Sequence, residues 1–236
     1  MKIIECRNLN KSYGTKQVLR EISLSMEKGE FFGLVGMNGG GKSTMIKCML
    51  DLVSIDNGNI KLFGESHRQV SSRENIAYLP DRFSPPPHLK GVDFLHYMLE
   101  LQGSQCSNEK IYNMLDALEL DKKSMTASVG QFSKGMTQKL GLSVCLLSEK
   151  KLLILDEPMS GLDPKARVLF KKELLSKKQQ GLSVFFSSHV LVDVDELADR
   201  IAVLHEGELK YVGSTEGLKK KYQVSTLEQA YMSCIS

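Results

Sequence analysis

The sequence contains no long apolar run. In its 236 residues, no stretch approaches the roughly 18 to 20 apolar residues that a membrane-spanning helix requires. The opening segment, MKIIECRNLNKSYG, also lacks the apolar core of a secretory signal peptide. If the protein serves a membrane, we therefore expect it to act from the surface as a peripheral subunit.

The sequence also lacks closely spaced pairs of cysteines and a large excess of positive or negative charge. The five cysteines are scattered and form no C-x-x-C pair, which predicts reduced thiols in a cytosolic compartment and no cysteine metal site. The 31 basic and 28 acidic side chains differ by three, so no strong overall field selects a partner. Lysine pairs at 171–172 and 177–178 lie among glutamate and glutamine on a predicted helix, which favours a solvated face. We expect no nucleic-acid partner.

The most informative stretch that is present runs from Phe31 to Thr44 and reads FFGLVGMNGGGKST. An apolar run typical of a buried strand is followed by glycines and then by a segment of helical composition, Met45 to Leu52. This matches the phosphate-loop pattern G-x-x-x-x-G-K-(S/T). Glycines let backbone N–H groups approach a polyanion, and a helix N-terminus adds a favourable dipole. The loop predicts a nucleotide site in which Lys42 reaches the β/γ phosphates and Ser43 ligates Mg²⁺.

Two strands are predicted before this loop, at Lys2 to Leu9 and at Val18 to Met26. The second alternates apolar and polar residues, which is typical of a strand with one covered face. The turn between them carries Tyr13, whose ring could stack on an adenine. An ordinary hairpin tyrosine is the alternative, and the phosphate loop downstream favours stacking.

The middle of the chain departs from strand–helix alternation. After predicted strands at Asn59 to Phe63 and Asn75 to Leu79, a proline-rich loop leads into helices at Val92 to Leu101 and Asn108 to Leu120, the latter capped by Asn108. A further helix is predicted at Thr137 to Leu147. We interpret this block as a helical subdomain inserted between two halves of a parallel sheet.

Alternation then resumes with acidic residues at a strand end. Leu152 to Leu155 form a predicted buried strand that leads directly into Asp156 and Glu157. Asp156 is a candidate Mg²⁺ ligand, and Glu157 could polarise the water that attacks a γ-phosphate. Because neighbouring carboxylates repel, one of the two is expected to have a raised pKa. The alternative is a solvated acidic turn.

The remaining alternation places His189 at the end of another strand. A helix begins with Asp163 as N-cap and Pro164 at its first position and stops at Gly181, and a strand at Leu182 to Phe186 leads to His189. Ligands bind at the carboxyl ends of parallel strands, so Lys42, Asp156 and His189 should converge. A strand at Arg200 to His205, an antiparallel Glu208 to Val212, and helices at Thr215 to Tyr222 and Thr226 to Cys234 complete the prediction.

These motifs together resemble the ATP-binding cassette family over essentially the full chain. The glycine loop is similar to its Walker A motif, Leu152 to Glu157 to its Walker B motif, Ser160 to Asp163 to its D-loop, and His189 to its switch histidine. FSKGM, at residues 132–136, is similar to the signature motif LSGGQ.

The resemblance implies ATP and Mg²⁺ as cofactors and two subunits paired head to tail, identical or not. Each ATP would then lie between one phosphate loop and the partner's signature helix. It implies an α/β P-loop fold with a mostly parallel sheet, in which 1–80 and 150–212 form the core with an N-terminal antiparallel β subdomain, 81–149 the helical subdomain and 213–236 a short helical tail. The implied catalytic residues are Lys42, Glu157 and His189, and the implied metal ligands are Ser43, Asp81 and Asp156. The implied nucleotide contacts are Tyr13, Gly36, Asn38, Gly39, Gly40, Gly41, Lys42, Ser43, Thr44, Asp81, Ser133, Gly135 and Asp163.

The chain departs from the family pattern in several places. Asp81 stands at the position of the Q-loop glutamine and adds negative charge near the γ-phosphate, which puts the turnover rate in question. Lys134 and Met136 replace a glycine and a glutamine of the signature, while Ser133 remains in place. Gly40 replaces a common alanine.

The resemblance favours the ATPase subunit of an exporter whose transmembrane permease subunits are separate chains, located on the cytoplasmic face of the membrane. The size, the single cassette and the short tail are similar to those of subunits of bacterial drug, bacteriocin-immunity or related export systems. The alternative is a soluble cassette ATPase in nucleic-acid maintenance, ribosome function or protein assembly. The absence of sustained heptads and of a second cassette disfavours that alternative.

Overall fold

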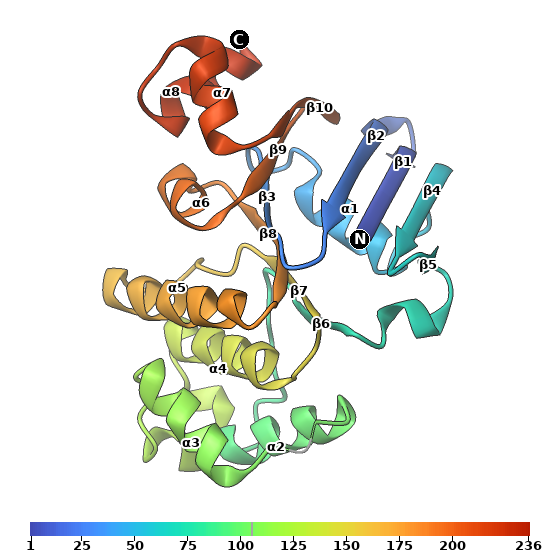
Figure 1. The fold of residues 1–236 in the computed structure, drawn as a ribbon. Coiled ribbons are helices and arrows are strands. Elements are labelled where there is room, and N and C mark those ends of the chain that lie inside the picture. Colours follow the sequence, from blue (N-terminus) through green and yellow to red (C-terminus); the bar gives the residue numbers. More distant parts are fainter. Residues whose placement is uncertain (105) are drawn as a thin grey trace.

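The structure, a computed structural model, describes residues 1–104 and 106–236. Two sheets and the helices around them make up the fold (Figure 1). In chain order the strands are β1 (Lys2–Tyr13), β2 (Lys16–Glu27), β3 (Phe31–Val35), β4 (Asn57–Leu62), β5 (Glu65–Ser66), β6 (Ile76–Leu79), β7 (Leu152–Asp156), β8 (Ser183–Ser188), β9 (Arg200–His205) and β10 (Glu208–Gly213). The α-helices are α1 (Lys42–Met49), α2 (Gly91–Leu101), α3 (Asn108–Ala117), α4 (Lys134–Leu147), α5 (Pro164–Gln179), α6 (Leu191–Leu197), α7 (Thr215–Tyr222) and α8 (Leu227–Ile235). Short 3₁₀ turns occupy Val70–Arg73, Ser124–Thr126 and Val129–Gln131.

The larger sheet determines where the site forms. Its strand order is β10-β9-β3-β8-β7-β6, and the neighbours from β9 to β6 are all parallel. Only β10 runs antiparallel, paired with β9 as predicted. The carboxyl ends of five parallel strands therefore meet along one edge, and the phosphate loop after β3 lies near the middle of that edge.

The smaller sheet is antiparallel, with the order β2-β1-β4-β5. Between it and the larger sheet lies α1, so that one apolar core contains residues of both sheets and of this helix (Figure 1). Together with the larger sheet, this antiparallel unit confirms the predicted α/β class with an antiparallel β part.

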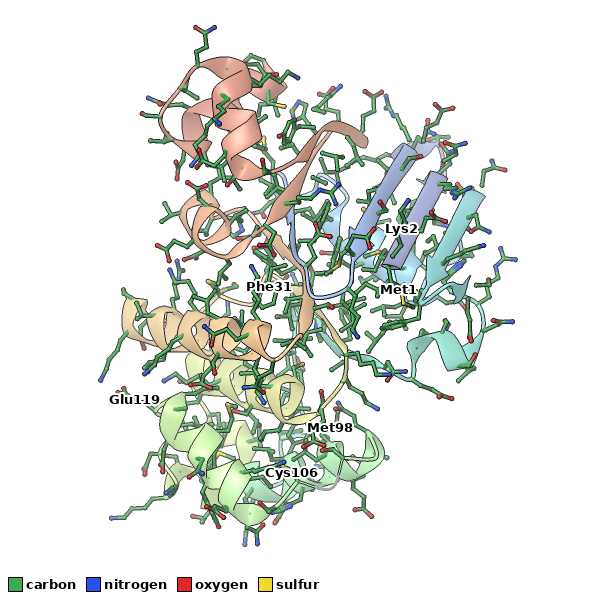
Figure 2. The ribbon with its side chains drawn as sticks, in the orientation of Figure 1. Met1, Lys2, Phe31, Met98, Cys106 and Glu119 are labelled. Carbon is green, nitrogen blue, oxygen red and sulfur yellow. The ribbon has the colours of Figure 1, made fainter. Side chains whose placement is uncertain are left out.

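Strand β3 shows why the larger sheet is covered on both faces. Phe32 and Leu34 belong to the core shared with α1, whereas Phe31 and Val35 belong to the core formed with the helices on the other face. Figure 2 shows Phe31 in the middle of the molecule. Because side chains alternate along a strand, an apolar run such as FFGLV is stable only where both faces are buried.

The helical block lies between β6 and β7, which are adjacent in the sheet. It contains α2, α3 and α4, at the lower end of Figure 1. The predicted insertion between parallel strands is therefore present. The exact division of the chain into residues 1–80, 81–149, 150–212 and 213–236 stays a prediction.

The starts of two helices differ from the prediction, because the residue that caps each helix lies at another position than the sequence pattern indicates. The N-cap of α3 is Ser107 rather than Asn108, and its hydroxyl accepts a bond from the Lys110 amide at 3.3 Å. The helix predicted from Thr137 starts at Lys134, because Ser133 caps it by accepting from the Met136 amide at 3.2 Å. By contrast, Asp163 caps α5 as predicted.

All five cysteines are free thiols, in agreement with the expectation of reduced cysteines. Burial raises the pKa of Cys6 and Cys145 to about 12 and that of Cys48 to about 11. Cys106 and Cys234 are half-buried. In the described part of the chain, no helix is long and apolar enough to cross a membrane.

The packing of the larger sheet against the α1 layer can be tested at Phe185. Its ring is fully buried and stacks on Phe32 with 5.7 Å between centroids. We expect Phe185→Ala to lower the free energy of unfolding by about 3–5 kcal/mol, because it removes buried area and leaves a cavity. Urea titration gives the value, with Val168→Ala on the exposed side of α5 as control. Equal effects of the two substitutions would contradict this account of the core.

Candidate functional site

The phosphate loop is shaped by close backbone contacts that exclude side chains. A Cβ on Gly36 would lie 2.4 Å from the Leu204 carbonyl oxygen of β9, so only glycine fits there. Gly39 and Gly41 have φ values of 79° and 103°, a conformation that L side chains rarely adopt. Gly41 is the N-cap of α1 and has no side chain to satisfy the first amides. The free N–H groups at this helix start can therefore bind an anion.

Lys42 lies at the centre of the site and is 5% exposed. Its Nζ donates to the carbonyl oxygens of Gly36, at 2.7 Å, and Met37, at 3.3 Å. It also forms an ion pair with Glu157 Oε1 at 3.1 Å. A nearly buried ammonium needs such partners, and it exchanges them readily for the oxygens of a phosphate.

Glu157 joins this lysine to His189. Glu157 Oε2 lies 2.8 Å from Nδ1 of His189. Glu157 also has a φ of 51°, in the left-handed region that is rare for a residue with a side chain. Its side chain therefore does not follow the alternation of side chains along β7. Instead it lies between Lys42 and His189. Of the three residues predicted to converge, Lys42 and His189 are thus joined through Glu157, whereas Asp156 hydrogen-bonds to Ser187 instead.

Asp156, one residue earlier, is 2% exposed. Burial is the main reason that its pKa is raised, while hydrogen bonding by the Ser187 and Ser43 hydroxyls lowers it and the charges of Asp81 and Glu157 raise it slightly. The expected raised pKa is thus found on Asp156, and its main cause is burial rather than repulsion between neighbouring carboxylates.

Ser187 is a site residue that the sequence analysis missed. Its Oγ donates to Asp156 Oδ1 at 2.6 Å and accepts from the Glu157 amide at 2.9 Å. The reason is the sheet register, which pairs Ser187 of β8 with Asp156 of β7. The only signal in the sequence was its position two residues before His189, at a predicted strand end.

A cavity of about 580 Å³ joins these residues. Its lining includes ten of the predicted nucleotide-contact, catalytic or metal residues: Tyr13, Asn38, Gly39, Gly41, Lys42, Ser43, Thr44, Asp81, Glu157 and His189. Ser160, Lys16, Val18 and Met37 complete the lining. Tyr13 is 48% exposed, so its ring is accessible to a planar ligand. The volume, the amide donors and the aromatic ring fit a nucleoside triphosphate.

Five predicted nucleotide contacts do not line this cavity. Two of them, Gly36 and Gly40, belong to the phosphate loop itself, and the other three lie in more distant segments. Ser133 and Asp163 cap α4 and α5, and backbone hydrogen bonding lowers the pKa of Asp163. A Cβ on Gly135 would lie 3.2 Å from the Gly161 carbonyl oxygen, so the signature helix packs against the D-loop of its own chain. The neighbouring cavity of about 640 Å³ is lined by Lys134 and shares Asp81 and Ser160 with the first. The exposed Ser133 is accessible from outside the chain.

The oxygen donors near the phosphate loop can be compared with the ligands that Mg²⁺ prefers. The described residues contain no cluster of three or more His, Cys, Asp or Glu side chains that could hold a metal by themselves. Asp156 and the Ser43 hydroxyl that lowers its pKa supply two hard oxygen donors next to the phosphate loop. This fits Mg²⁺, which typically takes one or two protein ligands and completes its shell with water and phosphate oxygens.

A phosphate loop follows a central parallel strand, and a buried aspartate and a glutamate follow one another at the end of β7, with the glutamate paired to a histidine after β8. This arrangement defines the class of P-loop NTPases. Within this class, the family model "ABC transporter" matches residues 19–160. The chain belongs to the ABC transporter family, as one of its ATP-binding proteins, and this confirms the predicted enzyme class of ATPase.

The names of three similar proteins agree with this assignment. A bacitracin transport ATP-binding protein of Enterococcus faecalis is 36% identical over 214 residues, which cover 88% of this chain and 68% of that protein. A lantibiotic transport ATP-binding protein of Streptococcus pyogenes is 34% identical over 211 residues, covering 88% and 89%. An uncharacterized ABC transporter ATP-binding protein of Synechocystis is 35% identical over 222 residues, covering 90% of this chain but 63% of that protein. The chain thus spans under two thirds of this last relative.

Solved structures agree on the fold. An ATP-binding subunit of an ABC transporter superposes with a TM-score of 0.89 at 26% identity, covering 98% of this chain and 99% of that one. A second ATP-binding cassette, solved as a dimer with ADP and Pi, has a TM-score of 0.81 at 20% identity, covering 89% and 98%.

The raised pKa of Asp156 leads to a stability prediction. A carboxyl whose pKa is higher in the folded than in the unfolded state destabilises the fold as pH rises through that interval. We expect Asp156→Asn, which cannot ionise, to be more stable than the wild type at pH 7 without Mg²⁺. The advantage should shrink as pH falls toward the ordinary carboxyl pKa of 3.8.

Urea unfolding at several pH values measures this difference. Asp116→Asn, at an exposed carboxylate on α3 that pairs with Lys122, is the matched control and should change stability little. An Asp156→Asn variant that is less stable than the wild type at pH 7 would contradict the prediction. It would show that hydrogen bonds to the Asp156 carboxylate outweigh the cost of burying its charge.

Proposed function

We propose that this chain binds ATP with Mg²⁺ and hydrolyses it to drive export through separate transmembrane subunits. The observation that carries the proposal is the continuous contact from Lys42 through Glu157 to His189 beside the phosphate loop. A cation for the phosphates, a carboxylate for the water and a histidine that orients this carboxylate are the groups that hydrolysis needs.

The mechanism follows from these contacts. As the triphosphate binds, Lys42 exchanges the Gly36 and Met37 carbonyls and Glu157 for β- and γ-phosphate oxygens. Glu157 is thereby released from its ion pair and accepts a proton from the attacking water, whose oxygen bonds to the γ-phosphorus as the bond to the ADP oxygen breaks. His189 holds the Glu157 carboxylate in place. Ser43 and Asp156 would hold Mg²⁺, with Asp81 acting on it through water, and the ion would supply positive charge that offsets the charge of the phosphates.

The remaining nucleotide contacts divide between this chain and a second subunit. Tyr13 stacks on the adenine, and the amides of Gly36 to Thr44, including Asn38 and Gly40, surround the phosphates. Ser133, Gly135 and Asp163 lie outside the cavity of their own chain, and we propose that they contact the nucleotide bound by a second ATP-binding subunit, identical or not. Residues 81–149 act as the helical unit that carries Ser133 to this partner.

Export and the location on the cytoplasmic face of the membrane rest on the relatives named for bacitracin and lantibiotic transport. The partners are then a second ATP-binding subunit and the transmembrane permease chains, on whose cytoplasmic side the pair of ATP-binding subunits assembles.

Glu157→Gln tests the reaction and the pairing together. The glutamine cannot take the proton, so we expect the ATPase rate to fall by about 10²- to 10⁴-fold while ATP binding is retained. Sedimentation with ATP should show a trapped dimer if the chain pairs with itself. Lys42→Ala, which removes the phosphate cation, should lose both hydrolysis and the ATP-dependent dimer. Full activity in Lys42→Ala would refute the site.

The transport proposal is tested by co-purification from detergent-solubilised membranes of the source cells. We expect a multi-span membrane protein to accompany the tagged chain in stoichiometric amount. The Phe185→Ala variant, which disturbs the core, serves as a control for non-specific capture and should recover less of this partner. Recovery of nucleic acid without a membrane protein would instead support the soluble alternative.

A further inference from the structure

The D-loop, residues 160–163, is anchored at its start to Glu157. The backbone amide of Ser160 donates to the carbonyl oxygen of Glu157 at 3.0 Å. The side chain of the same glutamate reaches His189, with 2.8 Å between Oε2 and Nδ1. One residue therefore fixes the start of the D-loop through its backbone and contacts the histidine through its carboxylate.

Arg167 of α5 holds the D-loop at its other end. Asp163 caps α5 by accepting a hydrogen bond from the Ala166 amide at 2.8 Å, so Arg167 lies at the end of the first turn of that helix. Its side chain turns back, and Nε donates to the Leu162 carbonyl oxygen at 3.3 Å. A guanidinium is a rigid planar fork, so directing Nε toward the D-loop also determines where its two other nitrogens point.

The rest of the guanidinium faces α6, which lies beside α5 in Figure 1. Nη1 of Arg167 lies 3.6 Å from Oδ2 of Asp193, in the first turn of α6. Asp193 is 5% exposed, and within the described part of the chain no hydrogen bond reaches this oxygen. Its other oxygen, Oδ1, accepts from Lys171 at 3.1 Å. A buried carboxylate needs cations near it, and here Arg167 and Lys171 each face one of its two oxygens.

These contacts form a closed ring around the pair Glu157–His189. Helix α6 starts two positions after His189, so Asp193 and the histidine belong to one short segment. The ring runs from Glu157 along the D-loop to Arg167. It returns from Arg167 through Asp193 and the start of α6 to His189, which contacts Glu157 again. A shift of the D-loop therefore acts on this pair from two directions, through the Glu157 backbone and through Arg167.

We propose that Arg167 is a positioning residue for ATP hydrolysis: it couples the D-loop to the start of α6 and thereby holds His189 against Glu157. This inference rests on the proposed function and deepens it. Arg167 and Asp193 are not among the residues that line the nucleotide cavity. The effect of Arg167 is therefore on the hydrolysis step and not on the binding of ATP.

Arg167→Met tests the coupling because it removes both contacts of the guanidinium and keeps an unbranched side chain. The matched control is Lys171→Met, which removes the other cation from Asp193 but leaves the contact with the D-loop in place. Lys171 also pairs with the exposed Glu196, so this control loses at least as many ion pairs. The measurements are kcat and KM for ATP, the Kd of trinitrophenyl-ATP with MgCl₂, and the melting temperature.

We expect Arg167→Met to lower kcat by about 10- to 100-fold, because a small misplacement of a catalytic group has effects of this size. The Kd of trinitrophenyl-ATP should stay within about 2-fold of the wild type. Lys171→Met should keep kcat within about 3-fold, although its melting temperature should fall as well. A purely structural role of the ion pairs predicts the opposite pattern, in which kcat follows the melting temperature in both variants.

A double-mutant cycle with His189→Ala shows whether Arg167 acts through this histidine. Independent effects multiply, whereas effects through one group do not. In the His189→Ala protein, Arg167→Met should lower the single-turnover rate by less than about 2-fold further.

Three results would overturn the inference: an unchanged kcat in Arg167→Met, an equal loss in Lys171→Met, or the full further loss in the His189→Ala protein. A loss that disappears at higher protein concentration would also overturn it, because Arg167 would then act on subunit pairing. If the wild type hydrolyses no ATP, the proposed function fails instead, and the two failures are distinguished.

Discussion

The buried ammonium of Lys42 is the group on which the rest of the site depends. It lies in a nearly water-free position, so it must be balanced by carbonyl oxygens and by a carboxylate. The carbonyls come from the loop after β3 and the carboxylate from the end of β7, two strands away in the sheet order. The pair can form only because parallel strands end at the same edge, and the glycines before the lysine leave room for its side chain to fold back over the loop.

The same sheet explains why two acids in sequence have different surroundings. Asp156 continues the line of β7, is buried and faces Ser187 on the neighbouring strand. Glu157 leaves that line through its left-handed backbone and lies against His189. Adjacent residues in a strand point to opposite sides, and the change in backbone direction adds to this difference. Asp156 is thereby suited to bind a metal ion and Glu157 to accept a proton, although the two side chains differ only by one methylene group.

Much of this could be predicted from the sequence, because short patterns with a physical cause determine it. The glycine loop, the strand ends and the capping aspartate before Pro164 follow from local backbone requirements. The approach of Lys42 and His189 to each other at one edge of the sheet follows from parallel strands. The role of Ser187 could not be predicted, since it depends on which residue pairs with Asp156 across β7 and β8. The N-cap of α3 is Ser107 and not the predicted Asn108, and the sequence could not decide between them because serine and asparagine both serve as N-caps.

The unequal burial of the thiols gives the protein a built-in pair of labelling positions. Cys6, Cys48 and Cys145 are buried, and their raised pKa values keep them as unreactive thiols at neutral pH. Cys106, just before α3, and Cys234, in α8, are the half-buried ones. Cys106, labelled in Figure 2, and α8, labelled in Figure 1, lie toward opposite ends of the molecule in this common orientation. Maleimide dyes on the native chain would therefore report the distance between the helical insertion and the α7–α8 pair, and resonance energy transfer could follow that distance through a catalytic cycle without engineered cysteines.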